Sequence, residues 1–117
     1  MAEAEAIRDV VIENNELQDR AGTAVFVGGA KGVKLSGNRI QAAAGAELRR
    51  KGPAILLERS SGVSLVDNAV LDPRAATTAA VEIGPDVAPG DAGVLISGLN
   101  AGLAPEAKPV LDRRTSR

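Results

Sequence analysis

One short pattern recurs along this chain of 117 residues and constrains its fold more than any other feature. Written generally, the pattern is apolar-x-apolar-x-x-Asn-x-apolar, and it begins at Val10, at Val33 and at Val63. A fourth, imperfect copy begins at Val94, where the Asn arrives one position late. The copies start 23, 30 and 31 residues apart, which indicates a protein built from stacked, similar units.

A second apolar stretch lies between successive copies, at residues 22–27 and 52–57 and more weakly at 78–83. Each stretch has the length of a strand and is opened by small or turn-forming residues. The connectors 28–32 and 58–62 both end in Gly, as expected where the backbone turns with positive φ. The extra residues of the longer units fall outside the strands, which a solenoid tolerates because each coil contacts only its neighbours.

The apolar runs are short, β-branched and bounded by Gly, so they do not fit helical solenoids, whose helices need longer runs at a period of about 3.6 residues. The Leu spacing of leucine-rich repeats is absent as well. Alternation instead puts Val33 and Leu35 on one face of a strand and Lys34 on the other. The repeat unit therefore consists of strands.

The repeated motif, preceded twice by a Gly-x-Ala strand, resembles the coils of right-handed parallel β-helix proteins, the pectin-lyase-like family in the broad sense. The resemblance covers residues 6–100 and implies an all-β fold, a right-handed parallel β-helix solenoid of about three to four coils. Residues 101–117 carry Pro105 and Pro109, and we expect them to form a polar, mobile C-terminal tail.

In such a solenoid, equivalent residues of successive coils stack in columns that line the core. The predicted columns are Val10/Val33/Val63/Val94, Ile12/Leu35/Leu65/Ile96, Leu17/Ile40/Val70, Val25/Ile55/Val81 and Val27/Leu57/Ile83.

Asn15, Asn38 and Asn68 are expected at the turn between the second and third strands of each unit. Asn tolerates the left-handed backbone conformation, and stacked Asn side chains can form a ladder of amide hydrogen bonds. The alternative is that these side chains bind a ligand. We favour the structural ladder.

The amino-acid composition excludes several classes of function for this chain. The net charge is −1, from 14 basic and 15 acidic residues, so a nucleic-acid partner has little electrostatic support. The basic run at 49–51 is too short to change this and is predicted to be a solvated loop. The chain has no Cys and no His, which excludes disulfides, thiolate or His metal sites and His-based catalysis. No cofactor and no metal are predicted.

Carboxylates remain as candidate catalytic groups, because glycoside hydrolysis uses a pair of them facing one groove. Alternation points Phe26, Leu56 and Glu82 outward in one column, with Glu58 on the same face. These four residues are the candidate ligand face, with Phe26 as a stacking platform for sugar. The alternative is a mixed solvent face, with Phe26 and Leu56 covered by a loop or the tail.

Two other motifs are weaker. Residues 28–32 contain Gly-Gly-Ala-Lys-Gly but lack the ending of a phosphate loop, so a turn is predicted there. A calcium-dependent lyase site would need clustered Asp residues with a basic partner. Asp67, Asp72 and Arg74 are close in sequence, but Pro73 makes this segment a turn candidate first.

Two functional hypotheses follow. The first is that the chain forms the C-terminal coils of a secreted carbohydrate-active protein, similar to the glycoside hydrolases or polysaccharide lyases of this fold. Its catalytic residues would then lie on upstream coils, the isolated chain would be inactive, and polysaccharide would be the partner. The second is a non-catalytic scaffold, spacer or surface adhesin module.

The environment of the chain is a further expectation. The resemblance implies a parent protein that is extracellular or periplasmic, although residues 1–6 lack the apolar region of a signal peptide. No apolar run approaches the roughly 20 residues that span a bilayer, so no membrane partner is predicted. The first coil has no evident cap, and its open edge is expected to pair with another chain or with an upstream coil.

Overall fold

The computed structural model describes residues 7–18, 23–42, 52–74, 76–88 and 93–114. Twelve strands lie within these ranges, and all of the pairing between them is parallel. The strands are β1 (Ile7–Glu13), β2 (Glu16–Gln18), β3 (Val25–Gly28), β4 (Ala30–Ser36), β5 (Arg39–Gln41), β6 (Ile55–Glu58), β7 (Val63–Val66), β8 (Ala69–Asp72), β9 (Ala79–Ile83), β10 (Val94–Ser97), β11 (Asn100–Leu103) and β12 (Lys108–Asp112).

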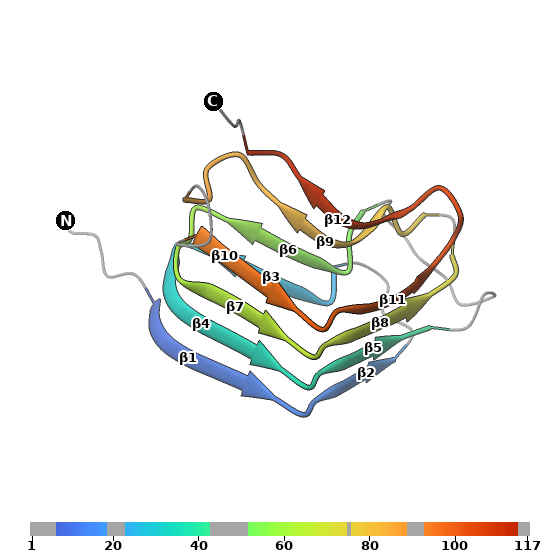
Figure 1. Cartoon of the computed structure of the whole chain (residues 1–117), viewed down its shortest axis with the longest axis horizontal. Helices are drawn as coiled ribbons and strands as arrows, with labels where there is room; N and C mark the ends of the chain where they lie inside the picture. The colour runs from blue at the N-terminus through green and yellow to red at the C-terminus, as the bar shows by residue number, and fades with distance from the viewer. Residues whose placement is uncertain (1–6, 19–22, 43–51, 75, 89–92, 115–117) are drawn as a thin grey trace.

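The strands form three parallel sheets of four, and each winding of the chain contributes one strand to each sheet. The orders are β1-β4-β7-β10, β2-β5-β8-β11 and β3-β6-β9-β12. Figure 1 shows the windings stacked from β1 and β2 at one end toward β10, β11 and β12 at the other. The molecule is therefore an all-β parallel solenoid, as the repeat predicts.

The predicted core columns are confirmed by the strand register. Val10 pairs with Val33, and Val63 with Val94, while Leu35 lies between Ile12 and Leu65. The second and third windings bury these side chains almost completely, whereas most of those in the first and last windings are only partly buried. Leu17 departs from the predicted core column, because it lies at the end of the stack and is 38% exposed. Because each buried aliphatic side chain contributes about 1.5–3 kcal/mol, the columns supply most of the driving force for folding.

The three asparagines lie on top of one another at the corner between the first and second sheets. The Asn15 amide Nδ2 donates to Asn38 Oδ1 at 3.1 Å, and Asn38 Nδ2 donates to Asn68 Oδ1 at 3.1 Å. Backbone N–H groups of Asn15 and Asn38 donate to the same oxygens at 3.0 Å. In the fourth winding Asn100 begins β11 instead, one position beyond the ladder.

The left-handed conformation expected at these asparagines belongs to the residue before each of them. The corner column is Asn14, Gly37, Asp67 and Gly98, with φ values of 56°, 65°, 54° and 69°. Asn, Asp and Gly are the residues that adopt this conformation at least cost. The ladder asparagines are thus free to turn their amides into the stack.

The corner column alternates between a short polar side chain and glycine, and this alternation has a steric reason. A Cβ atom at Gly37 would lie 2.6 Å from Asn14 Oδ1, and one at Gly98 would lie 2.2 Å from Asp67 Oδ1. The side chain of one winding therefore occupies the space that the glycine of the next winding leaves open.

We expect Gly37→Ala to destabilise the protein more than Gly29→Ala. Gly29 has a similar φ of 66°, but a Cβ atom there would meet nothing within 4 Å. Both variants should lose about 1 kcal/mol from the left-handed backbone, and Gly37→Ala should lose about 0.5 kcal/mol more, because the exposed Asn14 amide must rotate away from the new methyl group. Urea denaturation of both variants measures the difference, and equal losses would contradict the steric account.

The structure tests two expectations about segments. The turn expected over residues 28–32 is confirmed by the positive φ of Gly29 and Gly32, 66° and 70°, although β4 already begins between them at Ala30. The mobile tail expected from residue 101 instead contains most of β11 and all of β12, which pair with β8 and β9. Pro109 does not prevent this, because β12 is the outermost strand of its sheet and needs no donor on its outer side.

Candidate functional site

The predicted ligand face lies on the outer side of the third sheet. Phe26, Leu56 and Glu82 are directly opposite one another on β3, β6 and β9. Phe26 is 57% exposed, whereas Leu56 and Glu82 are partly buried. The structure therefore brings these three residues together in one outward column.

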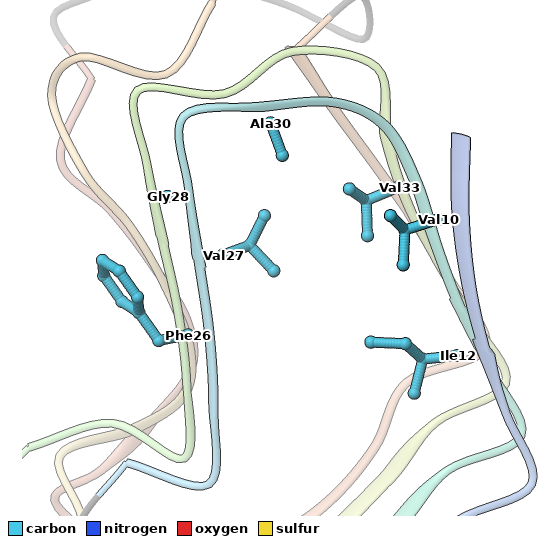
Figure 2. A pocket seen from close by; sticks show the side chains of 7 residues that line it. All are labelled: Val10, Ile12, Phe26, Val27, Gly28, Ala30 and Val33. Atoms are coloured by element: carbon cyan, nitrogen blue, oxygen red, sulfur yellow. The ribbon is translucent and has the colours of Figure 1, made fainter. Parts of the chain in front are cut away.

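The Phe26 ring covers part of its own strand. A Cβ atom at Gly28 would lie 2.8 Å from two of the ring carbons, so one edge of the ring lies against this glycine. Figure 2 shows Phe26 pointing away from the interior, on the opposite side of the strand from Val27. Gly28 thus makes room for an exposed aromatic surface, which is the kind of surface that can stack on a sugar ring.

The two candidate carboxylates are neighbours but are not equivalent. Glu58 pairs with Gly28 in the register, so it lies two residues further along the sheet than the column that contains Glu82. The Glu82 carboxylate accepts a hydrogen bond from Arg113 Nη1 at 3.1 Å, and its side chain is only 15% exposed. One of the two carboxylates on the candidate face is therefore already engaged by a cation.

The interior of the solenoid opens into a hollow at the β1–β3 end, which we call the end hollow (Figure 2). Its volume is about 400 Å³, and aliphatic side chains dominate its walls. The lining residues are Val10, Ile12, Phe26, Val27, Gly28, Ala30 and Val33. Without a described polar or charged side chain among them, the end hollow offers dispersion contacts rather than chemistry.

Sequence reasoning missed the most buried polar cluster, at the end of β8. Asp72 is fully buried and Arg74 is 5% exposed. The Arg74 guanidinium donates from Nε to Asp72 Oδ1 at 2.8 Å and from Nη2 to Oδ2 at 2.7 Å. Thr77 Oγ1 also donates to Oδ2 at 2.9 Å. The segment is a turn, as predicted, but the turn is closed by a buried ion pair.

Burial alone would raise the pKa of Asp72, but the hydrogen bonds from Arg74 and Thr77 outweigh it and lower the pKa from 3.8 to about 2. The charged form of Asp72 is therefore stabilised in the folded protein. Because the folded pKa is depressed, this contribution is fully present above the unfolded pKa and is lost as the pH falls through the folded value.

We therefore expect the free energy of unfolding to fall by about 2 kcal/mol between pH 5 and pH 2 on account of Asp72 alone. Urea titrations at several pH values would measure the slope. Asp72→Asn lowers stability at every pH, but its slope in this window should be shallower than that of the unaltered protein. Parallel slopes would show that Asp72 does not carry this dependence.

Other acidic and basic groups do not gather at one site in the described residues. Asp67 is exposed at the corner with a positive φ, and Asp86 is exposed in a turn. Asp91 and the basic run at 49–51 lie outside the described residues. Within the described ranges, no three acidic residues converge closely enough to hold a metal ion. The Asp67, Asp72 and Arg74 combination does not form one site, since Asp67 is exposed and Asp72 is buried.

A search for membrane spans found no helix in the described part of the chain that has the length and apolarity to cross a bilayer. Comparison with family models, with curated proteins and with solved structures gives no match to this chain. The function of the chain is therefore inferred from its geometry.

Proposed function

We propose that this chain is a non-catalytic β-solenoid scaffold. The observation that supports this role is the ion pair between Glu82 and Arg113, which occupies one of the two carboxylates available on the candidate face. Glycoside hydrolysis needs two carboxyl groups flanking one bond, one of them free to give up a proton. Right-handed winding belongs to this proposal, since parallel strand crossovers are right-handed in nearly all proteins.

Other polar groups in the described residues also serve the stack. The asparagine amides bond along the ladder, and the Asp72 carboxylate bonds Arg74 and Thr77. On the second sheet, Gln41 Nε2 donates to Glu16 Oε2 at 3.1 Å and links neighbouring windings on the outside. Side chains engaged in these hydrogen bonds stabilise the stacked windings, and few polar groups are left to catalyse a reaction.

A second candidate is polysaccharide binding along β3, β6 and β9, as expected for a piece of a carbohydrate-active parent outside the cell. The specific observation that favours it is the exposure of the Phe26 ring beside Leu56. An exposed aromatic face can stack on a sugar, and the flanking Glu58 can accept hydrogen bonds from hydroxyl groups.

We expect the purified chain to release neither reducing sugar nor unsaturated product from a panel of plant, algal and bacterial polysaccharides. Turnover that Glu82→Gln abolishes would overturn the scaffold proposal. Affinity electrophoresis on the same panel tests the second candidate. There, retardation that Phe26→Ala removes and Val11→Ala retains would replace the scaffold with a binding module. Val11 is a suitable control because it is equally exposed, at 57%, on a different sheet.

A further inference from the structure

Among the described residues, the large exposed hydrophobic side chains all belong to the two end windings. Val11, Leu17 and Phe26 lie on β1, β2 and β3, and they are 57%, 38% and 57% exposed. Leu95 lies on β10 and is 48% exposed. Large exposed apolar side chains that occur in the end windings of the described stack and not in its middle windings indicate that these windings meet a partner.

The strand register relates these residues in pairs. Val11 and Leu95 are the two ends of one outward column, whose middle positions are the polar residues Lys34 and Ser64. Phe26 and Leu111 are likewise the two ends of the outward column that contains Leu56 and Glu82. If a second copy continued the stack, Leu95 would lie beside Val11, and Leu111 beside Phe26.

The core is also open at both ends. Val10 and Ile12 are only partly buried at the end hollow, and Ile96 and Val110 are only partly buried in the last winding. The same inner columns are sealed in the middle of the stack. Ile96 would continue onto Ile12 of a following copy, and Val110 onto Val25, so the apolar contacts of the middle windings would be repeated at the junction.

We propose that copies of this chain stack head to tail, with β10, β11 and β12 of one copy pairing in parallel with β1, β2 and β3 of the next. In the described part of the chain, each of these six strands has a neighbour on one side only. Their outer edges therefore present backbone donors and acceptors to a further strand. A contact between unlike ends does not close on itself, so it extends into a filament.

The alternation of residues in the corner column favours head-to-tail over head-to-head stacking. Asn14, Gly37, Asp67 and Gly98 alternate a side-chain oxygen with a glycine, and each oxygen lies where the glycine of the next winding has no Cβ atom. Head-to-tail stacking places Gly98 before Asn14 of the next copy and continues the alternation. Head-to-head contact would instead set one Asn14 against the other.

Charge favours the same polarity. The described side chains of β1 and β2 include three exposed carboxylates, Asp9, Glu13 and Glu16. The described part of the last winding has no such excess of anions, since Arg113 pairs with Glu82 and Arg114 with Asp112. A head-to-head contact would bring two sets of carboxylates to one junction, whereas a head-to-tail contact keeps them apart.

Pro109 removes one backbone donor from the proposed junction but does not prevent stacking. Lys108 N–H donates to Thr78 inside the sheet, so the next nitrogen along the strand, that of Pro109, faces the outer edge and carries no hydrogen. The β12 edge loses one donor there, while β10 and β11 contain no proline. Stacking depends on the end windings alone and is independent of whether the outer face binds sugar.

The test uses two variants of the full chain, Ile12→Glu and Ile96→Glu. Each places a charge in the inner column at one end and leaves the other end intact. Sedimentation velocity should show concentration-dependent oligomers for the unaltered chain and monomers for each variant alone. A mixture of the two variants should form a one-to-one dimer, because it contains one competent head and one competent tail.

Each other outcome overturns the proposal. Monomers of the unaltered chain at its highest soluble concentration would exclude stacking. Dimers of Ile96→Glu alone would show head-to-head contact, and a mixture that stays monomeric would exclude a head-to-tail junction. If either variant loses its cooperative thermal transition, Val11→Glu and Leu95→Glu replace the pair, because these positions are exposed and disturb the core less.

Discussion

Arg74→Ala is expected to lower the free energy of unfolding by about 3–5 kcal/mol, the largest effect of any single substitution considered for this chain. The variant removes the guanidinium that bonds both oxygens of Asp72 and leaves that carboxylate buried. A buried carboxylate that has lost its cation must be protonated, be hydrated or move to the surface, and each of these weakens the packing at the end of β8. Guanidinium chloride denaturation at neutral pH measures the loss.

The chain contains a matched control for this substitution. Asp112 and Arg114 repeat the same Asp-x-Arg geometry, with Arg114 Nε at 2.9 Å from Oδ1 and Nη2 at 2.7 Å from Oδ2. The Arg114 side chain is 16% exposed, and the Asp112 side chain is 42% exposed. Water therefore screens this pair, and Arg114→Ala should cost about 1 kcal/mol or less.

A double variant separates two costs of Arg74→Ala, the buried Asp72 charge that has lost its cation and the loss of packing. Asp72→Leu combined with Arg74→Met removes both charges and keeps the apolar volume, so it should recover much of the stability that Arg74→Ala loses. If Arg74→Ala and Arg114→Ala destabilise equally, burial does not govern the strength of this motif and the interpretation of the cluster is wrong.

Asn38→Ala is expected to lower the free energy of unfolding by about 2–3 kcal/mol. Asn38 is the central member of the ladder and is 4% exposed. Its Oδ1 accepts from the backbone N–H and the side-chain amide of Asn15, and its Nδ2 donates to Ile12 O and Asn68 Oδ1. Alanine leaves the Ile12 carbonyl, the Asn15 N–H groups and the buried Asn68 Oδ1 without these partners.

Asn100→Ala is the control for the ladder, because Asn100 is an exposed asparagine that opens β11 one position beyond the ladder. Thermal and urea unfolding of the two variants should differ clearly, with Asn100→Ala within about 0.5 kcal/mol of the unaltered protein. Similar curves for both variants would mean that the amide column contributes little to stability.

The strand register could be predicted from sequence because it depends on a repeated pattern. Aliphatic residues at Val10, Val33, Val63 and Val94 recur with the same local spacing, and equivalent residues of a solenoid stack. The outward column of Phe26, Leu56 and Glu82 follows from alternation along the same strands.

Features that depend on one winding alone could not be predicted in this way. The last strand, β12, was missed because Pro109 normally argues against a strand, and only its position at the edge of a sheet makes it acceptable. The partner of Glu82 was missed for the same reason, since Arg113 follows that strand directly. The two Asp-x-Arg motifs, at Asp72 and Asp112, were the available signal for ion pairs at strand ends.

The alternation of Asn14, Gly37, Asp67 and Gly98 has a consequence for how such a molecule can be shortened or lengthened. Removing the winding that holds Gly37 would bring Asn14 against Asp67, and removing the one that holds Asp67 would bring two glycines together. Either excision breaks the match at that corner, whereas excising both windings restores it. The number of windings can therefore change by two without disturbing the alternation at this corner, whereas a change of one winding breaks it.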